Sequence, residues 1–374
     1  MHGAYFLYKR KLKKGIVWYY KAYKPDGTLS TGKSTGQTSK QNARAYCDNL
    51  LQRGFLFNGI SISFQSYASG WFSEGSSWLE NKLIESSEDS PSISKRTLYQ
   101  YELSLNKHIL PYFGHLRMNE ITPNTVKSFR TMLLNEKGIS RGTINNVVKA
   151  LKIILDTALA DDVMVHDAMR GITSLRENCS TRDAFTYEEA VKIFDYKWQD
   201  KSNKLLMLVA ALTGMRIGEL LAIGKDRLHE KYIDVSLQNF RGTLISCKTK
   251  IGRKVPIPKK LYKLLSGCVD KDNDGLCFPK CSNSASLKKL KYVLEQIGLK
   301  DEIKKRNLCI HSWRHFFNTY LRANNVSDAK IKAVMGHSSG KGSMTERYTN
   351  WKPDMFPEVY ELQEKLIKDL WHDD

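Results

Sequence analysis

The run of residues 205–223 constrains the fold of this chain most strongly, because apolar side chains fill it almost without interruption. A run of that length and apolarity predicts a helix buried in the core of a folded domain. Gly214 breaks the run, and two charged residues, Arg216 and Glu219, follow the glycine. Burying a guanidinium costs free energy unless it pairs with an anion or faces a polar ligand. The sequence therefore predicts a charged site inside this apolar core.

Arg216 is open to two interpretations. A planar guanidinium matches two non-bridging oxygens of a phosphate, which would make Arg216 an anion-binding residue. Glu219 lies three residues later, on the same helix face, and would hold Arg216 in orientation. Alternatively, the two residues form a buried ion pair whose role is only structural. The pair alone does not choose between these two roles.

Two histidine-containing motifs follow in the last third of the chain. His311 and Arg314 are spaced so that they share one helix face, which sets a group that titrates near neutral pH beside a permanent cation. His337 comes directly after a glycine, and Tyr348 follows beyond a loop. Nearby cations favour the phenolate of a tyrosine, whose ordinary pKa is about 10, and so make it a nucleophile. Taken singly, these motifs fit a surface His/Arg pair and a tyrosine packed for stability equally well.

The segment 247–254 is basic and predicts a hairpin turn. A lysine at a hairpin tip is able to protonate a leaving oxygen, and Lys248 and Lys250 both qualify. An exposed, charged turn without a chemical role is the simpler alternative for such a sequence.

In their order along the chain, these motifs resemble the tyrosine recombinase (phage-type integrase) family, most of all the integrases of phages and of integrative conjugative elements or conjugative transposons. Residues 213–220 match the family's TGxRxxEL motif, residues 311–315 its HxxRH motif, and residues 336–337 its GH motif. The resemblance assigns a supporting role to Glu219 and catalysis to six residues: Arg216, Lys248, His311, Arg314, His337 and the nucleophile Tyr348. Trp313 departs from the leucine that is common in the family, and the loop before Tyr348 is slightly long.

The resemblance implies a DNA breaking and rejoining enzyme that works by transesterification through a 3′-phosphotyrosine. Tyr348 would attack the scissile phosphate, with His311 accepting its proton and Lys248 protonating the leaving 5′-oxygen. The covalent bond conserves the energy of the phosphodiester, so no cofactor and no metal are expected. The sequence agrees with this expectation, since it contains neither a Walker A motif nor a CxxC pair for zinc.

Composition shifts divide the chain into three expected domains, which are mainly α-helical with small β elements. Residues 1–58 predict a β-β-β-α unit, which resembles the family's arm-type DNA-binding domain. Residues 59–175 predict a helical core-binding (SAM-like) domain, and residues 176–374 the mixed α/β catalytic domain. The catalytic domain is expected to end in a tail helix over residues 354–371.

Local patterns predict the individual elements. Aromatic and β-branched runs predict strands in the first domain at residues 4–12, 16–23 and 28–36, before a helix at 40–53. Helices are expected in the second domain at residues 94–109, 122–134 and 143–159, with Pro111 ending the first of them and Thr122 capping the second. The apolar residues of the third, which include Ile144, Leu151 and Ile154, fall on one side of that helix. In the third domain, strands are expected at 232–236 and 243–247, and residues 254–257 are expected to close a hairpin with the latter strand. Further helices are expected there at residues 286–298, 311–324 and 327–335, and a capping box at Thr186 is expected to begin this domain.

The chain carries a formal net charge of +20, which favours polyanionic partners and makes double-stranded DNA the expected one. Residues 1–55 hold eleven lysines and arginines against two acidic residues. Basic residues alternate with aromatics there, which suits a sheet face that enters a DNA groove; a solvated basic face over an aromatic core is the alternative. The residues expected to contact DNA are Lys9, Arg10, Lys11, Lys21, Lys95, Arg96 and Arg141.

The tail predicts a protein partner as well. Met355, Val359, Leu362, Leu366 and Leu370 recur at helical spacing and form an apolar stripe that must be covered. The stripe either covers its own domain or docks on a neighbouring protomer, and the second is favoured because strand exchange uses several active sites in sequence. A homo-oligomer of two to four chains on DNA is therefore expected, with the tail exchanged between protomers. An accessory excisionase or DNA-bending protein is a further partner to consider.

The favoured function is the integrase of a mobile genetic element, acting in the bacterial cytoplasm. No apolar run is long enough to predict a membrane span, and no secretory signal is evident. A chromosome or plasmid resolvase of the same family is the nearest alternative, although such enzymes usually lack a basic N-terminal β domain. A type IB topoisomerase shares the chemistry. A DNA-binding regulator that has lost catalysis is disfavoured by the complete set of catalytic residues.

Overall fold

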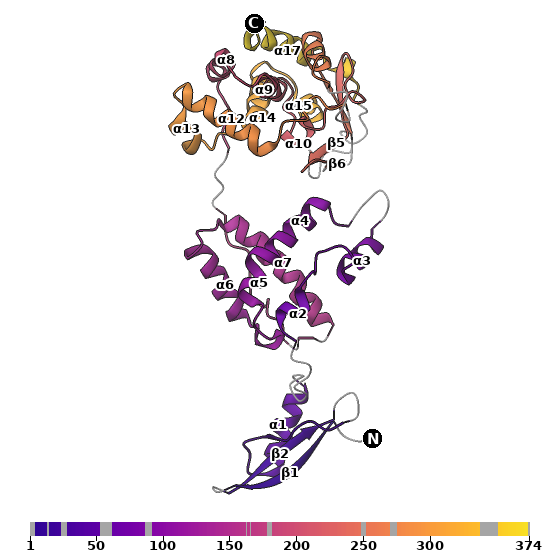
Figure 1. Cartoon of the computed structure of the whole chain (residues 1–374), viewed down its shortest axis with the longest axis vertical. Helices are drawn as coiled ribbons and strands as arrows, with labels where there is room; N and C mark the ends of the chain where they lie inside the picture. The colour runs from indigo at the N-terminus through magenta and orange to yellow at the C-terminus, as the bar shows by residue number, and fades with distance from the viewer. Residues whose placement is uncertain are drawn as a thin grey trace. The chain divides into compact units, whose positions relative to one another are not determined.

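The computed structural model describes residues 4–12, 15–23, 28–52, 62–86, 92–161, 163–164, 166–177, 182–247, 252–269, 275–336 and 351–372. The chain forms two compact units, Met1–Asn178 and Cys179–Asp374 (Figure 1). The architecture is mainly helical with small sheets, as the sequence predicted. None of the helices in this described part of the chain is both long and apolar enough to cross a bilayer.

The first hydrophobic core lies under a three-stranded antiparallel sheet. β1 (Tyr5–Leu12), β2 (Gly15–Ala22) and β3 (Lys33–Ser34) pair in that order, and α1 (Lys40–Gln52) follows them. Tyr20, Ala22 and Cys47 form the core, so α1 covers one face of the sheet. The predicted β-β-β-α order is confirmed, but β3 has only two residues. Gly32 and Gly36 flank it, and glycine is a poor strand former.

The second core belongs to a group of helices in the same unit. Its elements are α2 (Phe64–Ala68), α3 (Ser77–Ile84), α4 (Lys95–Ser104), η1 (Leu105–Ile109), α5 (Leu110–Phe113), η2 (Met118–Glu120), α6 (Pro123–Asn135) and α7 (Arg141–Ala160). The predicted cap at Thr122 is confirmed, since its side chain accepts a hydrogen bond from the Thr125 amide. α7 buries an apolar face that includes Ile144, Leu151 and Ile154, as its helical spacing predicted.

Pro111 does not end the first long helix of this core, so that prediction is wrong. η1 is a π-helical turn, and after it the Leu110 amide donates to the Leu105 carbonyl. The wider turn restarts the helix, so that Pro111 stands in the first turn of α5. Amides in the first turn of a helix lack an intrahelical partner in any case, so proline is tolerated there. The helical path therefore continues to Phe113.

The second unit is built around α9 (Lys201–Thr213), in which every residue from 205 to 213 is buried, as predicted. The other helices of this unit are α8 (Tyr187–Asp195), α10 (Ile217–Leu220), α11 (Lys259–Ser266), α12 (Asn283–Gln296), α13 (Lys300–Lys305), α14 (His311–Ala323), α15 (Asp328–Met335), η3 (Pro353–Met355) and α17 (Pro357–Leu370). α14 packs along α9, near the centre of the unit (Figure 1). The capping box predicted at Thr186 is present at the start of α8.

The strand pairing of this unit differs from the prediction. β4 (Tyr232–Val235) pairs with β7 (Arg253–Pro256), whereas β6 (Thr243–Ser246) pairs with β5 (Leu237–Phe240), which was not predicted. The expected hairpin between residues 243–247 and 254–257 is therefore wrong. Arg241 and Gly242 connect β5 to β6, and both have a positive φ. Two such residues form the tight turn that joins neighbouring antiparallel strands. The backbone of β6 therefore forms its hydrogen bonds with the adjacent strand β5 and not with a distant strand.

In the single chain the tail packs on its own domain, which is the alternative that the sequence left open beside docking on a neighbouring protomer. Val359, Leu366 and Leu370 of α17 are buried in the main core of the second unit. Gln363 Nε2 donates to the carbonyl oxygens of Leu212 and Pro256, both at 2.8 Å, and ties α17 to α9 and β7. Within this chain, most of the apolar stripe is covered by the second unit itself.

We predict that Leu366→Ala destabilises the second unit by about 2–5 kcal/mol, because it removes a fully buried side chain and leaves a cavity. The measurement is urea unfolding of the full chain at two protein concentrations, with the exposed neighbour Lys365→Ala as the matched control. A tail held in cis gives the same loss at both concentrations. A loss that shrinks as the protein is concentrated would show that the tail docks between chains.

Candidate active site

Gly214 ends α9 and lets the chain turn into a charged cluster. Its φ of +61° is left-handed, and a Cβ at this position would lie 2.9 Å from Phe317 Cδ1 on α14. Glycine is therefore required both by the backbone conformation and by the close approach of α14. The chain restarts at α10, where the Arg216 amide donates to Glu219 Oε2 at 2.9 Å. The break predicted at Gly214 is confirmed.

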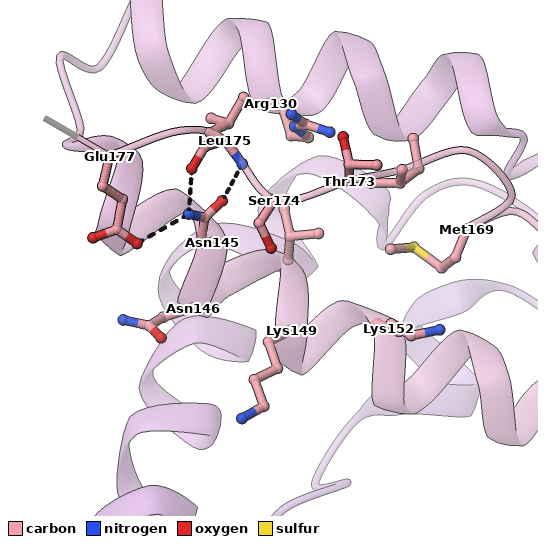
Figure 2. A pocket seen from close by; sticks show the side chains of 12 residues that line it. Arg130, Asn145, Asn146, Lys149, Lys152, Met169, Thr173, Ser174, Leu175 and Glu177 are labelled. Atoms are coloured by element: carbon pink, nitrogen blue, oxygen red, sulfur yellow. Dashed lines mark hydrogen bonds between the residues drawn. The ribbon is translucent and has the colours of Figure 1, made fainter. Parts of the chain in front are cut away.

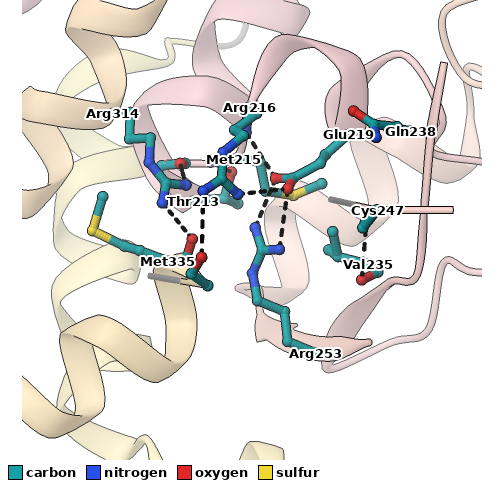
Figure 3. Close-up of polar contacts among 12 residues, drawn as sticks. Thr213, Met215, Arg216, Glu219, Val235, Gln238, Cys247, Arg253, Arg314 and Met335 are labelled. Carbon is teal, nitrogen blue, oxygen red and sulfur yellow. Dashed lines mark hydrogen bonds and ion pairs between the residues drawn. The ribbon is translucent and has the colours of Figure 1, made fainter. Parts of the chain in front are cut away.

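The carboxylate of Glu219 is buried between two guanidinium groups, as Figure 3 shows, and its side chain is 4% exposed. Arg216 Nη1 donates to Oε1 at 2.9 Å. Arg253 approaches as a fork, with Nη1 3.2 Å from Oε1 and Nη2 2.7 Å from Oε2. Burial alone would raise the pKa of this carboxyl, but the hydrogen bonds and charge of Arg253, and then of Arg216, hold the pKa below its usual range. Glu219 is thus an anion at neutral pH, and the predicted pair with Arg216 is present.

The C-terminal end of α15 is held by three arginines at once. The last carbonyl oxygens of a helix have no partner within the helix and carry its partial negative charge, so cations stabilise them. Three consecutive carbonyls accept one hydrogen bond each: Val334 from Arg253 Nε at 2.8 Å, Met335 from Arg314 Nη2 at 2.5 Å, and Gly336 from Arg216 Nη2 at 3.3 Å. The cluster therefore joins segments that are far apart in the sequence, from α10, β7, α14 and α15.

Arg314 is deeply buried, at 3% exposure, and its Nη1 also donates to the Gly214 carbonyl at 2.7 Å. Burial, together with the charges of Arg216 and Arg253, lowers the pKa of Arg314 to about 9, which leaves the guanidinium charged at neutral pH. Among the residues that the structure describes, these three guanidinium groups are balanced by one carboxylate, that of Glu219. The excess of positive charge suits a bound phosphate.

His311 opens α14, one helical turn before Arg314. Burial, followed by the charges of His315 and Arg314, lowers the pKa of His311 to about 4. The imidazole is therefore neutral at neutral pH and is able to accept a proton. The ring centroids of His311 and His315 are 5.1 Å apart, and burial lowers the pKa of His315 as well. A bound phosphate would offset part of the cationic charge and make His311 a stronger base.

The structure brings Arg216, Glu219, His311 and Arg314 together, as the sequence predicted. The other predicted site residues, Lys248 with its alternative Lys250, His337 and Tyr348, lie outside the described residues. Two of the described residues directly precede predicted site residues in the sequence. Gly336 precedes His337 and is held by Arg216, and Cys247 precedes Lys248. Cys247 is buried, and burial, followed by the charge of Glu219, raises the pKa of its thiol to about 11.

Arg253 is a member of the cluster that the sequence analysis missed. In the sequence Arg253 is one of several basic residues in the segment 248–254, and a segment of this kind is usually interpreted as an exposed, charged turn. Its position at the first residue of β7, directly before an apolar strand, was the available signal. A basic residue that enters a buried strand needs an anion to receive it.

The predicted DNA-contacting residues of the N-terminal sheet divide between its two faces. The register pairs Phe6 with Lys21, Tyr8 with Tyr19 and Arg10 with Val17, which places these six residues on the face that α1 does not cover. Arg10 lies over the ring of Tyr19, 5.3 Å from its centroid. Lys9 and Lys11 extend from the opposite face, where Lys9 lies 5.5 Å from the centroid of Trp18.

The helical part of the first unit has a pocket of about 510 Å³ between α6, α7 and residues 169–177 (Figure 2). Three basic side chains line it: Arg130, Lys149 and Lys152. Asn145 holds the wall in place, because its side chain bonds both the carbonyl and the amide of Leu175, at 2.9 and 2.8 Å. The predicted DNA contacts Lys95, Arg96 and Arg141 are exposed near the starts of α4 and α7.

Two models of known protein families match parts of the chain. Residues 183–354 match the model of the phage integrase family, and residues 84–134 match that of the phage integrase N-terminal SAM-like domain. The chain belongs to the phage integrase family, the tyrosine recombinases. The first match contains the whole arginine cluster, and the second contains α4 to α6.

Three members of this family illustrate the likeness. The chain is 30% identical over 182 residues to the ICEBs1 integrase of Bacillus subtilis, an alignment that covers 46% of this chain and 49% of that integrase. It is 22% identical over 299 residues to the tyrosine recombinase XerC of Listeria innocua, covering 75% of this chain and 96% of XerC. The lambda integrase in a tetramer bound to a Holliday junction has the same fold, with a TM-score of 0.57 at 16% identity over 92% of this chain and 96% of the other.

We predict that His311 makes the folded chain less stable in acid. Its pKa is about 4 in the folded chain and about 6.5 when unfolded, so the unfolded chain binds the extra proton between these values. Stability is therefore complete above pH about 6.5 and falls as the pH is lowered towards about 4. Urea unfolding across this range should give a shallower pH dependence for His311→Gln than for the unchanged chain. The exposed His372→Gln is the control, and equal slopes in all three proteins would contradict the buried, neutral state of His311.

Proposed function

We propose that this tyrosine recombinase is the integrase of a mobile genetic element, which cuts and rejoins double-stranded DNA at specific sites by transesterification. The observation that carries the proposal is the excess of buried positive charge around Arg216 and Arg314, for which Glu219 is the balancing carboxylate among the described residues. A scissile phosphate supplies negative charge to this cluster, and guanidinium groups match its non-bridging oxygens.

In the proposed cleavage step, the phenolic oxygen of Tyr348 attacks the scissile phosphorus. A bond forms between that oxygen and the 3′-phosphate, and the bond from phosphorus to the 5′-oxygen breaks. His311, neutral because its pKa is about 4, accepts the tyrosine proton, and Lys248 gives a proton to the leaving 5′-oxygen, with Lys250 as the alternative donor. Arg216 and Arg314 offset the charge that builds on the phosphate, and His337 adds a further hydrogen bond.

Rejoining reverses these steps with a different strand. The 5′-hydroxyl of a partner DNA attacks the phosphotyrosine, gives up its proton to the lysine, and releases the tyrosine, which recovers its proton from His311. Two phosphoester bonds are exchanged without net hydrolysis, so the energy of the DNA backbone is conserved throughout. No metal or cofactor takes part in this scheme.

The likenesses support a role in mobile DNA and an assembly on DNA. The Bacillus subtilis relative is named an integrase, and the lambda integrase occurs as a tetramer on a Holliday junction. We extend both features to this chain as dimers that pair into tetramers on two DNA sites. An accessory excisionase or DNA-bending protein completes the proposed complex, which acts on DNA in the bacterial cytoplasm.

Two surfaces of the first unit are proposed to bind the DNA outside the cleavage site. The uncovered face of the N-terminal sheet presents Arg10 and Lys21 beside the ring of Tyr19, which suits a DNA groove with its phosphates. The second surface consists of exposed basic side chains and of the basic lining of the pocket in Figure 2. The exposed side chains are Lys95, Arg96 and Arg141.

A resolvase of the same family is the second candidate, because the alignment with XerC covers 96% of that protein. The basic sheet of β1, β2 and β3 favours the integrase, since it offers a DNA-binding surface in addition to the helical and catalytic parts. The two candidates differ in substrate. An integrase recombines the two ends of the element that carries its gene, and a resolvase recombines two copies of one chromosomal or plasmid site.

We predict that Tyr348→Phe abolishes covalent attachment to a nicked DNA site and leaves DNA affinity unchanged, because only the nucleophilic oxygen is lost. Gel separation under denaturing conditions measures the covalent complex, and a binding titration on the same DNA measures affinity. The matched control is Tyr360→Phe on α17, which should react normally. A covalent complex that persists in Tyr348→Phe would refute the assignment of the nucleophile.

The face of the N-terminal sheet that binds DNA is tested separately. Arg10→Ala and Lys21→Ala should each weaken binding and lower the slope of log affinity against log salt by about 0.9 for each phosphate that the protein no longer neutralises. Lys11→Ala, on the opposite face, is the matched control and should change the slope less. A larger effect from Lys11→Ala than from Arg10→Ala would show that the covered face, and not the open one, meets the DNA.

A further inference from the structure

We infer that Arg253 is a positioning residue for DNA cleavage, which orients Arg216 through Glu219 and fixes the end of α15 from which the chain runs on to His337. The inference rests on the proposed function, because it concerns the same phosphate-binding cluster. Within that cluster the side chain of Arg253 is 10% exposed, against 37% for that of Arg216, and Arg314 is 3% exposed. Its hydrogen bonds go to Glu219 and to the Val334 carbonyl, so its donors are engaged by protein groups.

Glu219 determines the orientation of the Arg216 side chain. Both the amide and the Nη1 of Arg216 donate to the Glu219 carboxylate, so the direction of this carboxylate sets the direction of the Arg216 side chain. The two-pronged contact from Arg253 holds the carboxylate from the other side, at 2.7 and 3.2 Å. A fork of this kind fixes the plane of a carboxylate, which a single hydrogen bond does not. Figure 3 shows Glu219 between the two guanidinium groups.

Arg253 also holds the C-terminal end of α15. Arg253 Nε donates to the Val334 carbonyl at 2.8 Å, and the guanidinium packs directly against Gly336. A Cβ at Gly336 would lie 2.9 Å from Arg253 Nη1 and 3.0 Å from both Cδ and Cζ, so the contact exists only because residue 336 is glycine. The φ of +62° at Gly336 has the same requirement.

A bound phosphate would engage Arg216 and Arg314 but not Arg253. Arg216 and Arg314 then direct donors to the phosphate oxygens, and the 3.3 Å bond from Arg216 to the Gly336 carbonyl is the longest of the three at the helix end. The Nε, Nη1 and Nη2 groups of Arg253 are already engaged by the Val334 carbonyl and by Glu219. Arg253 therefore continues to hold both the carboxylate and the helix end while the other two arginines are engaged with the DNA.

The position of Arg253 on β7 adds a link to the predicted lysine. Arg253 is paired with Val235 of β4, and Lys248 and Lys250 lie just before it in the chain. One guanidinium thus connects the strand after the lysine segment, the carboxylate that orients Arg216, and the helix that leads to His337. Lysine is not a substitute, because an ammonium group lacks the planar fork and the separate Nε donor.

The experiment measures cleavage by full-length Arg253→Lys on nicked DNA whose scissile phosphate carries sulfur in place of one or the other non-bridging oxygen. We expect the rate of covalent-complex formation on ordinary DNA to fall about 10²-fold, with DNA affinity unchanged. We also expect the ratio of rates for the two sulfur isomers to move towards one, because misdirected arginines no longer distinguish the two oxygens. A rate loss with an unchanged ratio of isomer rates would overturn the inference, because a purely structural role predicts that result.

Arg227→Lys is the matched control. Arg227 is also a largely buried arginine, with its Nε bonded to the Ala222 carbonyl at 3.1 Å and its Nη1 paired with Asp226 at 2.7 Å. The Arg227→Lys variant should leave the ratio of the two isomer rates unchanged, whatever its effect on the stability of the fold. If Arg253→Lys does not fold, Arg253→Gln leaves Glu219 paired with Arg216 and gives the same readout.

The outcome for the unchanged chain separates the two proposals. If it forms no covalent complex with any DNA site, the proposed function fails. If it forms the complex and Arg253→Lys keeps both its rate and its isomer ratio, the role of Arg253 alone is wrong.

Discussion

The buried carboxylate of Glu219 is the interaction on which the site depends. It accepts hydrogen bonds from Arg216 on one side and from Arg253 on the other, with its side chain only 4% exposed. Removing this anion would leave three guanidinium groups together in a buried site, where unpaired charge is strongly unfavourable. The break of α9 at Gly214 and the restart at α10 are what bring Arg216 and Glu219 into the core at the required place.

The same arginines also organise the end of α15. Its last carbonyl oxygens carry the negative end of the helix and receive Arg253, Arg314 and Arg216 in turn. One carboxylate and one helix terminus hold the cations apart without neutralising them, so the cluster keeps positive charge for a phosphate. Because these partners are fixed before DNA arrives, little reorganisation is needed in the transition state, which is the condition for strong electrostatic catalysis.

The structural features that depend only on neighbouring residues were predicted correctly from the sequence. The cap at Thr122 and the break at Gly214 depend on neighbouring residues, and both were identified; the arginine and histidine motifs were identified by resemblance. The pairing of β7 with β4 was predicted wrongly, because it depends on which distant strand offers the better fit. Arg253 was missed for the same reason. Its role exists only once folding brings Glu219 and Val334 to it.

We propose that Arg216 acts on the phosphate and that Arg253 orients it through Glu219, so that the two arginines contribute to catalysis as one unit. A double-mutant cycle on the rate of covalent-complex formation tests it most directly, with Arg216→Lys, Arg253→Lys and the combined variant of the full chain. Residues that act as a unit give non-additive losses, so the combined variant should be little slower than Arg216→Lys alone. Losses that multiply in the combined variant would contradict the account, because they would mean that the two arginines act independently.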